Sequence, residues 1–352
     1  MPGAPVKGAA ENRSSAPSTP ASSDQGGEGR VPEQEGKRKK KIVRPAREKH
    51  RLIARCEYCL FLLLFSFLRF LPFPVAFRVG EWIGVLLYHC DRHHRRVGLI
   101  NLAIAFPQKT VAEHHAILRS SFLNLGRMVA EFCHMHTLTP ESITERITFT
   151  DPERWREIVN KAKPTGAVIL TAHFGNWELL AYSHAHYGFP IQIIHRRLRN
   201  PFIDDVIVRE RECSGNKVIR KTVAGIEVFR ALRQKAFVAV AIDQNASGRM
   251  GIFVPFFSRL ASTSSGAAGL VLAAGVPVIP AFPIRENGTW RHRIVMGEPI
   301  EFVPTGNQEE DLRVLTEKFS AVVQHIIEQY PDHWLWIHKR WKRRPAGEAP
   351  IY

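Results

Sequence analysis

The sequence predicts an α/β protein with a mostly parallel central sheet flanked by helices, preceded by an N-terminal helical region that anchors it to a membrane. Short apolar runs rich in β-branched residues, typical of buried strands, alternate with segments of helical length and periodicity in the second half of the chain. Strands separated by such helices pair in parallel, because each helix carries the chain back across the sheet. A dense apolar region near the N-terminus precedes this alternation.

Residues 1–50 are predicted to form a disordered, basic N-terminal tail. Residues 1–36 are rich in Pro, Gly, Ser, Ala and Glu and show no periodic apolar face. They also lack the charged start and apolar core of a secretory signal. A run of lysines and arginines follows at residues 37–51, which suits an acidic partner or an anionic surface.

Residues 51–90 are predicted to form an apolar membrane anchor. The densest apolar run, residues 59–68, has about half the length needed to cross a bilayer. Pro72 and Pro74 should break any continuous helix. Basic clusters flank both sides, and since both favour the cytoplasmic face, we expect an interfacial or re-entrant anchor rather than a single span. An amphipathic first helix of the globular domain is the alternative.

Residues 91–345 are predicted to form the catalytic domain, because the strand and helix patterns alternate here. We expect helices at residues 101–136, 151–162, 200–212 and 267–274, and strands at residues 167–172, 191–195, 237–242 and 276–282. The five cysteines have no disulfide rhythm, so we expect them to be reduced.

The motif HFGNWE at residues 173–178 lies between the first of these strands and a helix. Gly175 allows a tight turn and Asn176 suits a helix N-cap. With His173 on the turn and Glu178 in the first helical turn, the carboxylate can reach one imidazole nitrogen and fix its tautomer. The other nitrogen is then free to take a proton from a substrate hydroxyl. The alternative is a capping histidine and a solvated glutamate.

Polar residues follow three of the predicted strands directly. His173, Arg196 and the pair Asp243 and Gln244 each stand just past a strand end. Ligands of such sheets bind at the carboxyl ends of the strands, so these residues are candidates for one site. Alone, Asp243 and Gln244 would more often be turn and capping residues, and Arg196 a surface charge.

Several blocks occur in an order that resembles the bacterial lipid A late acyltransferase family, the lauroyl and myristoyl acyltransferases. They span roughly residues 52–344 and comprise TAHFGNWE at 171–178, HR at 195–196 with Asn200 and Pro201, AIDQN at 241–245, GIFVPFF at 251–257, GVPVIPAF at 275–282 and YPDHWLWIHKRW at 330–341. The tryptophans of the last block, interleaved with basic residues, suit either a membrane interface or inward packing.

The resemblance implies a glycerolipid acyltransferase-like fold and a His/Glu general-base mechanism without acyl-enzyme, metal or cofactor. The catalytic pair maps onto His173 and Glu178. Candidates for binding substrate or the oxyanion are Arg196, Gly175, Asn176, Asn200, Asp243 and Gln244.

The implied donor is acyl-acyl carrier protein and the implied acceptor a hydroxyl of a lipid A precursor, at the cytoplasmic face of the bacterial inner membrane. The net charge of +16 suits an acidic carrier protein, phosphorylated lipids and the membrane surface. Another membrane lipid, such as a glycolipid, phosphatidylinositol mannoside or aminolipid, is the alternative acceptor. A non-catalytic membrane or nucleic-acid-binding protein is a remote alternative, and we expect no nucleic-acid partner.

Overall fold

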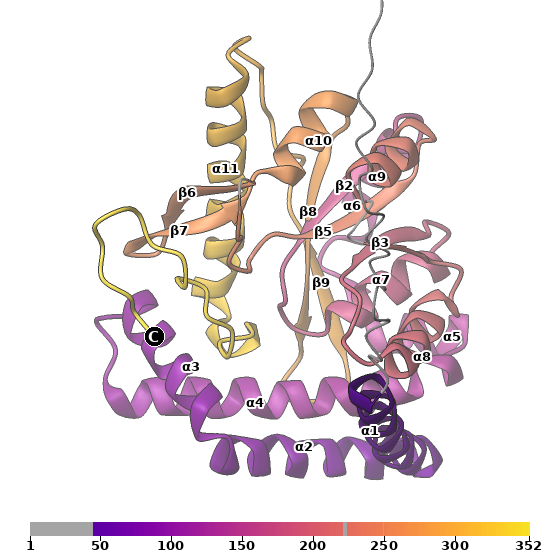
Figure 1. The fold of residues 1–352 in the computed structure, drawn as a ribbon. Coiled ribbons are helices and arrows are strands. Elements are labelled where there is room, and N and C mark those ends of the chain that lie inside the picture. The colour runs from indigo at the N-terminus through magenta and orange to yellow at the C-terminus, as the bar shows by residue number, and fades with distance from the viewer. Residues whose placement is uncertain (1–44, 221–223, 249) are drawn as a thin grey trace, which may run out of the picture. The chain divides into compact units, whose positions relative to one another are not determined.

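The computed structural model describes residues 45–220, 224–248 and 250–352, and residues 48–352 form one compact unit (Figure 1). The predicted disorder of residues 1–36, and most of the basic run that follows, lies outside the described residues. The first described helix begins at Pro45.

The elements alternate along the chain much as predicted. The helices are α1 (Pro45–Phe70), α2 (Phe73–Cys90), α3 (Arg92–Ala105), α4 (Val111–His134), α5 (Pro140–Arg146), α6 (Pro152–Ala162), α7 (Trp177–His186), α8 (Pro201–Glu212), α9 (Ala224–Arg233), α10 (Gly266–Ala274) and α11 (Gln308–Gln329), with short 3₁₀ turns at Met135–Thr137 and Pro331–His333. The strands are β1 (Ile147–Phe149), β2 (Ala167–Thr171), β3 (Ile191–His195), β4 (Lys217–Arg220), β5 (Phe237–Ala241), β6 (Gly251–Phe256), β7 (Arg259–Ser264), β8 (Val278–Arg285) and β9 (His292–Met296).

The central sheet has seven strands in the order β1-β9-β8-β2-β5-β3-β4. All neighbours pair in parallel except β8 and β9, which form an antiparallel pair. The predicted mostly parallel α/β sheet is therefore confirmed. Strands β6 and β7 form a separate antiparallel hairpin.

Strand β2 lies in the middle of the sheet and is buried along its whole length. Its side chains alternate between two apolar clusters. Val168 and Leu170 belong to the cluster that contains residues of α9, α10 and α11. Ala167 and Ile169 belong to the cluster that contains residues of α5, α6, α7 and α8. Helices thus cover both faces, which explains why the strand sequence is continuously apolar.

The helix predicted over residues 101–136 is in fact two helices. Helix α3 ends at Ala105 and α4 begins at Val111. Pro107 has no N–H to continue a helix, and Thr110 starts α4 with a reciprocal capping box to Glu113. The helical periodicity of the sequence continues through this break, which is why it suggested a single helix.

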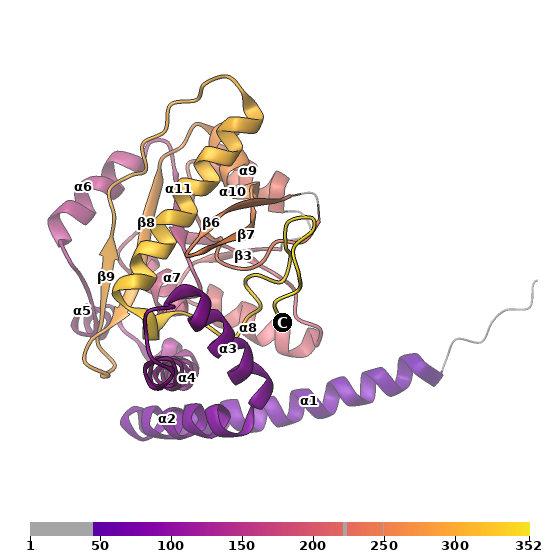
Figure 2. The same cartoon turned by 90° about the vertical axis from the view of Figure 1, so that its left-hand side faces the viewer.

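Helices α1 and α2 run along the underside of the molecule, with the predicted break at Pro72 between them (Figure 2). Helix α2 packs closely on α4, and the contact depends on glycines: a Cβ atom on Gly80 would lie 2.5 Å from the carbonyl oxygen of Gly126. Among the described helices, none combines the length and apolarity needed to cross a membrane.

Candidate active site

The site begins with the register of β2 and β5. Thr171 pairs with Ala241 at the carboxyl ends of the two strands. Two residues further along each strand stand His173 and Asp243, so the parallel pairing brings them together. Nδ1 of His173 lies 2.9 Å from Oδ1 of Asp243, and the backbone N–H of His173 donates to Oδ2 at 3.0 Å.

Asp243 is fully buried, and its Oδ2 atom also accepts the indole N–H of Trp334 at 2.9 Å. A carboxylate only accepts hydrogen bonds, so Nδ1 of His173 must carry the proton that it shares with Asp243. The Nε2 atom of His173 then holds a lone pair. The Gln244 amide lies 3.3 Å from that atom, and the imidazole is 28% exposed.

The charges around the imidazole increase its basicity. Burial disfavours a positive charge on His173, but the charge and hydrogen bond of Asp243, together with the charge of Glu178, outweigh burial and raise the pKa of His173 above its ordinary value. Burial works against ionisation of Asp243, yet the facing His173 holds the pKa of that carboxyl well below its usual range. Asp243 is therefore a permanent anion beneath the base.

Glu178 does not make the contact that the sequence predicts. It lies in the first turn of α7 as expected. Its carboxylate, however, accepts hydrogen bonds from Nε and Nη2 of Arg211, at 2.8 and 2.5 Å, and from the indole N–H of Trp177 at 3.0 Å. Asp243, which the sequence suggests for substrate or oxyanion binding, holds the imidazole instead. Glu178 influences His173 through its charge.

The turn after His173 has the predicted glycine and cap. Gly175 has a φ of +55°, and a Cβ atom there would lie 1.9 Å from the carbonyl oxygen of Pro283. The Asn176 side chain accepts from the backbone N–H of Leu179. However, the Gly175 N–H already donates to the carbonyl of His333 at 2.8 Å, so it does not face an oxyanion.

Of the remaining predicted residues, Gln244 reaches the imidazole, whereas Arg196 and Asn200 make no hydrogen bond to it. Gln244 is exposed beside the base, and Arg196 is exposed at the end of β3. The Asn200 side chain caps α8 and donates to the carbonyl oxygen of Ala54 at 2.6 Å, which gives it a structural role between α8 and α1. Of the predicted residues, His173, Asp243 and Gln244 meet directly.

A second buried network supports the turn from below and was not predicted. Glu131 on α4 accepts both terminal nitrogens of Arg285, at 2.6 and 2.7 Å, and also Nε2 of His292 and Nδ2 of Asn176. Burial opposes the charge of Glu131, but Arg285 and His292 hold its pKa well below the ordinary value. Nothing in the local sequence marks Glu131, because its partners come from distant strands.

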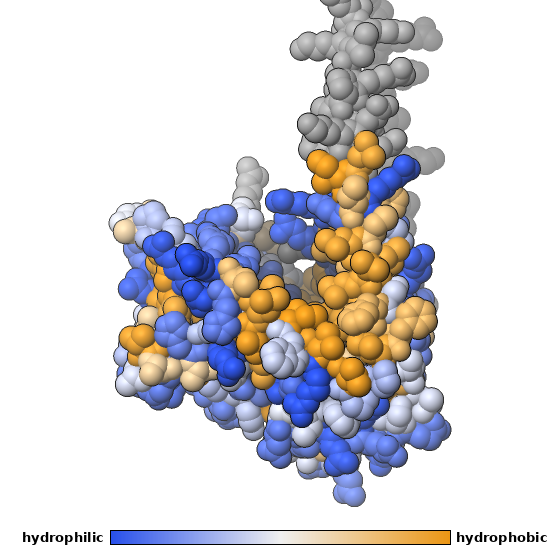
Figure 3. Space-filling view, turned by 90° about the horizontal axis from the view of Figure 1, so that it is seen from below, coloured by the Kyte–Doolittle hydropathy of each residue, from blue (hydrophilic) through white to orange (hydrophobic). Residues whose placement is uncertain are grey.

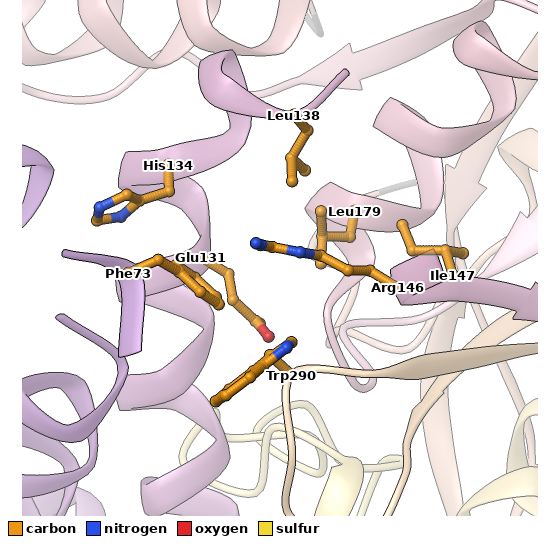
Figure 4. Close-up of a pocket in the computed structure, with 8 residues that line it drawn as sticks. All are labelled: Phe73, Glu131, His134, Leu138, Arg146, Ile147, Leu179 and Trp290. Carbon is orange, nitrogen blue, oxygen red and sulfur yellow. The ribbon is translucent and has the colours of Figure 1, made fainter. Parts of the chain in front are cut away.

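Figure 4 shows the small pocket beside this network. Its volume of about 10 Å³ has room for roughly one water molecule. It is lined by Phe73, Glu131, His134, Leu138, Arg146, Ile147, Leu179 and Trp290. This pocket is too small for an acyl chain.

The C-terminal block completes the site. Trp334, Trp336 and Trp341 are fully buried, so they pack inward and do not lie at a membrane interface. The backbone N–H of Leu335 donates to the carbonyl of His173, and Nε2 of His338 lies 3.1 Å from the carbonyl oxygen of Asp243. The arrangement is an imidazole fixed by a buried carboxylate, with a second nitrogen that is chemically able to accept a proton.

Comparison with known proteins gives a consistent result. The family model described as bacterial lipid A biosynthesis acyltransferase matches residues 44–343. The chain is 26% identical over 293 residues to the lipid A biosynthesis lauroyltransferase of Escherichia coli strain K12, a match that covers 80% of this chain and 90% of that protein. It is 25% identical over 280 residues to the lipid A biosynthesis myristoyltransferase of the same organism, covering 79% and 83%.

Proposed function

Because the chain belongs to the bacterial lipid A biosynthesis acyltransferase family and is thus an acyltransferase, we propose that it moves a fatty acyl chain from acyl carrier protein to a hydroxyl of a lipid A precursor. The observation that carries the proposal is the His173 and Asp243 pair. It leaves a lone pair on Nε2, which makes only a long 3.3 Å contact to the Gln244 amide, and the imidazole is partly exposed at the strand edge where ligands of such sheets bind.

In the proposed reaction, Nε2 of His173 takes the proton of the acceptor hydroxyl while the hydroxyl oxygen attacks the thioester carbonyl. The imidazolium that forms is stabilised by Asp243 beneath it and by the nearby charge of Glu178. The tetrahedral intermediate then collapses, the carbon–sulfur bond breaks, and the thiolate of the carrier takes the proton back from Nε2. The product is an ester, and no acyl-enzyme forms.

The oxyanion of that intermediate requires hydrogen-bond donors. The Gly175 N–H is engaged, so the proposal assigns this role to side chains. The Gln244 amide is 3.3 Å from the base, and Arg196 is exposed at the neighbouring strand end. Arg196 could equally hold an acceptor phosphate, and either role places positive charge where the reaction or the acceptor is negative.

We further propose that the protein lies on the cytoplasmic face of the inner membrane, with residues 51–90 as its anchor and residues 91–345 as its catalytic domain. Large apolar side chains are exposed together on α1 and α2, where Figure 3 shows an apolar area on the underside of the molecule. They are Leu52, Ile53, Leu60, Leu63, Leu64, Phe67, Phe70, Val75, Trp82, Leu86 and Leu87.

This apolar surface suits the boundary between headgroups and acyl chains. Phe70 is 88% and Trp82 75% exposed, which is unusual for side chains that water disfavours. Arg92 and Arg96, exposed at the start of α3, can face anionic headgroups. Binding of this apolar surface to the membrane would bring the candidate site to the bilayer in which a lipid A precursor resides.

A transfer assay tests the function. Purified protein is incubated with radiolabelled lauroyl- or myristoyl-acyl carrier protein and a tetra-acylated lipid A precursor, alongside His173→Ala. We expect labelled lipid from the wild type and a loss of several orders of magnitude in the variant, with similar melting temperatures. Undiminished transfer by His173→Ala would overturn the mechanism. If the wild type labels extracted membrane lipids but not the lipid A precursor, the acceptor assignment is wrong.

A further inference from the structure

We propose that His195, whose ring is oriented by Asp204, is a positioning residue that holds Arg211 against Glu178 beside the catalytic base. The inference rests on the proposed function, because it concerns the same site. His195 ends β3, and Asp204 and Arg211 stand on α8. Together with Glu178 on α7 they form a continuous line of hydrogen bonds, and the Trp177 indole that donates to Glu178 packs against the His173 ring.

Arg211 is held at both ends of its guanidinium group. Its Nε and Nη2 atoms donate to the two oxygens of Glu178, and its Nη1 atom lies 2.7 Å from Nδ1 of His195. The Arg211 side chain is only 16% exposed, so solvent cannot easily replace a lost partner. The hydrogen bond that Arg211 donates to His195 therefore fixes the orientation of the guanidinium group against the Glu178 carboxylate.

His195 has a single compatible tautomer. A guanidinium only donates, so Nδ1 of His195 must accept; a carboxylate only accepts, so Nε2 must carry the proton that it gives to Asp204 at 2.7 Å. Asp204 is fully buried and also accepts the backbone N–H of Leu198 at 2.7 Å. The imidazole is thus locked in orientation between two fixed partners.

The position of Arg211 matters for the reaction. Glu178 raises the pKa of His173 and Arg211 lowers it, so the basicity of the catalytic imidazole depends on how close each charge lies. The Trp177 indole, which donates to Glu178, stands edge-on to the His173 ring with a centroid distance of 5.2 Å. A shifted Arg211 would release Glu178 and with it the indole that packs on the base.

Two substitutions of His195 separate its hydrogen bond to Arg211 from its hydrogen bond to Asp204. An asparagine places its oxygen where Nδ1 stood and keeps the acceptor for Arg211, whereas a glutamine places its amide nitrogen where Nε2 stood and keeps only the donor to Asp204. We expect His195→Gln to lower kcat about 10- to 100-fold with an unchanged KM for the acyl donor, and His195→Asn to stay within about threefold. If His195 only stabilised the fold, kcat would fall in proportion to the fraction of protein that is unfolded.

Arg220→Gln is the matched control, since Arg220 is the neighbour of His195 on β4 and donates to the other oxygen of Asp204 at 3.0 Å, but makes no hydrogen bond to the His195 ring. It should leave kcat within about twofold. If His195→Gln does not fold, His195→Asn carries the test alone: native melting with retained kcat supports the inference, and native melting with lost kcat overturns it. Equal kcat in all three variants also overturns it.

An NMR readout keeps this inference separate from the proposed function. The Nε–H resonance of Arg211, assigned by its absence in Arg211→Lys, should exchange slowly in the wild type and in His195→Asn and be broadened in His195→Gln. A resonance unaffected by either substitution would contradict the positioning role, even if the wild type transferred no acyl chain. Absence of wild-type transfer with the expected NMR pattern would fault the proposed function alone.

Discussion

The indole N–H of Trp334 donates to Oδ2 of Asp243 at 2.9 Å, across 91 residues of sequence. The same oxygen accepts the backbone N–H of His173. The segment that carries Trp334 also forms a β-bridge to Phe174 and donates from Leu335 to the carbonyl of His173. The C-terminal block therefore fixes the carboxylate and the turn that carries the base.

Trp334→Phe should separate this support from bulk packing. Phenylalanine keeps most of the apolar volume but removes the donor to Asp243. We expect kcat to fall about tenfold and the free energy of unfolding to fall by roughly 1–3 kcal/mol. Trp341→Phe is the control, because its indole nitrogen is buried without a hydrogen-bond partner in the described part of the chain. Equal kcat in the two variants would count against the support role.

Glu131→Gln should destabilise the fold strongly. The substitution leaves Arg285, whose side chain is 3% exposed, without its compensating charge. Breaking a buried pair in this way costs about 3–5 kcal/mol of unfolding free energy. Glu298→Gln, which breaks an exposed pair with Arg154, should cost far less, because solvent screens exposed charges. Denaturant unfolding measures both, and similar losses in the two variants would contradict the buried network's importance.

The buried His184 should make stability depend on acidity. Neither of its ring nitrogens has a hydrogen-bond partner among the described residues, and burial lowers its pKa to about 4. The unfolded chain binds a proton near pH 6.5, so stability falls as pH drops from there toward 4, by up to about 3 kcal/mol. In His184→Leu the melting temperature should depend less on pH over this range than in the control His93→Leu, which replaces an exposed histidine. An unchanged slope would refute the assignment.

The catalytic rate should also depend on pH through His173. The base must be neutral to take a proton, and its pKa is raised, so kcat/KM should fall with acidification with a midpoint above the ordinary value of about 6.5. Glu178→Gln removes a negative charge near the imidazole, and we expect it to move this midpoint to lower pH. A midpoint that rises or stays in place in Glu178→Gln would show that the carboxylate charge does not act on His173.

Much of the fold could be predicted from local sequence. The four predicted strands and the predicted helices α6, α7, α8 and α10 are present because apolar runs and caps such as Asn176 act over a few residues. Strands β1, β4, β6, β7 and β9 were not predicted: β1 and β4 are too short to show a period, β7 and β9 mix polar and apolar residues, and β6 contains a proline, which argues against a strand. The predicted single helix over residues 101–136 failed for the opposite reason: the periodicity continued through a capped break.

The candidate site could be predicted in part. Strand ends identified His173, Asp243 and Gln244 because parallel strands carry their following residues to one edge. Proximity in sequence suggested Glu178 as the partner of His173, but pairing between β2 and β5 determines that Asp243 is closer. Arg211 and Glu131 come from helices whose positions depend on the assembled sheet, so no local pattern marks them.

The most direct test is to determine which ring nitrogen of His173 carries the proton. Side-chain ¹⁵N NMR reports this, and His173→Ala assigns the His173 signals. In the wild type we expect the proton on Nδ1. In Asp243→Asn the amide oxygen should face the two donors, the His173 backbone and Trp334, so that the NH₂ group faces Nδ1 and moves the imidazole proton to Nε2. Glu178→Gln should leave the proton on Nδ1. An Nδ1 proton that persists in Asp243→Asn but is lost in Glu178→Gln would contradict the central claim that Asp243 orients the base.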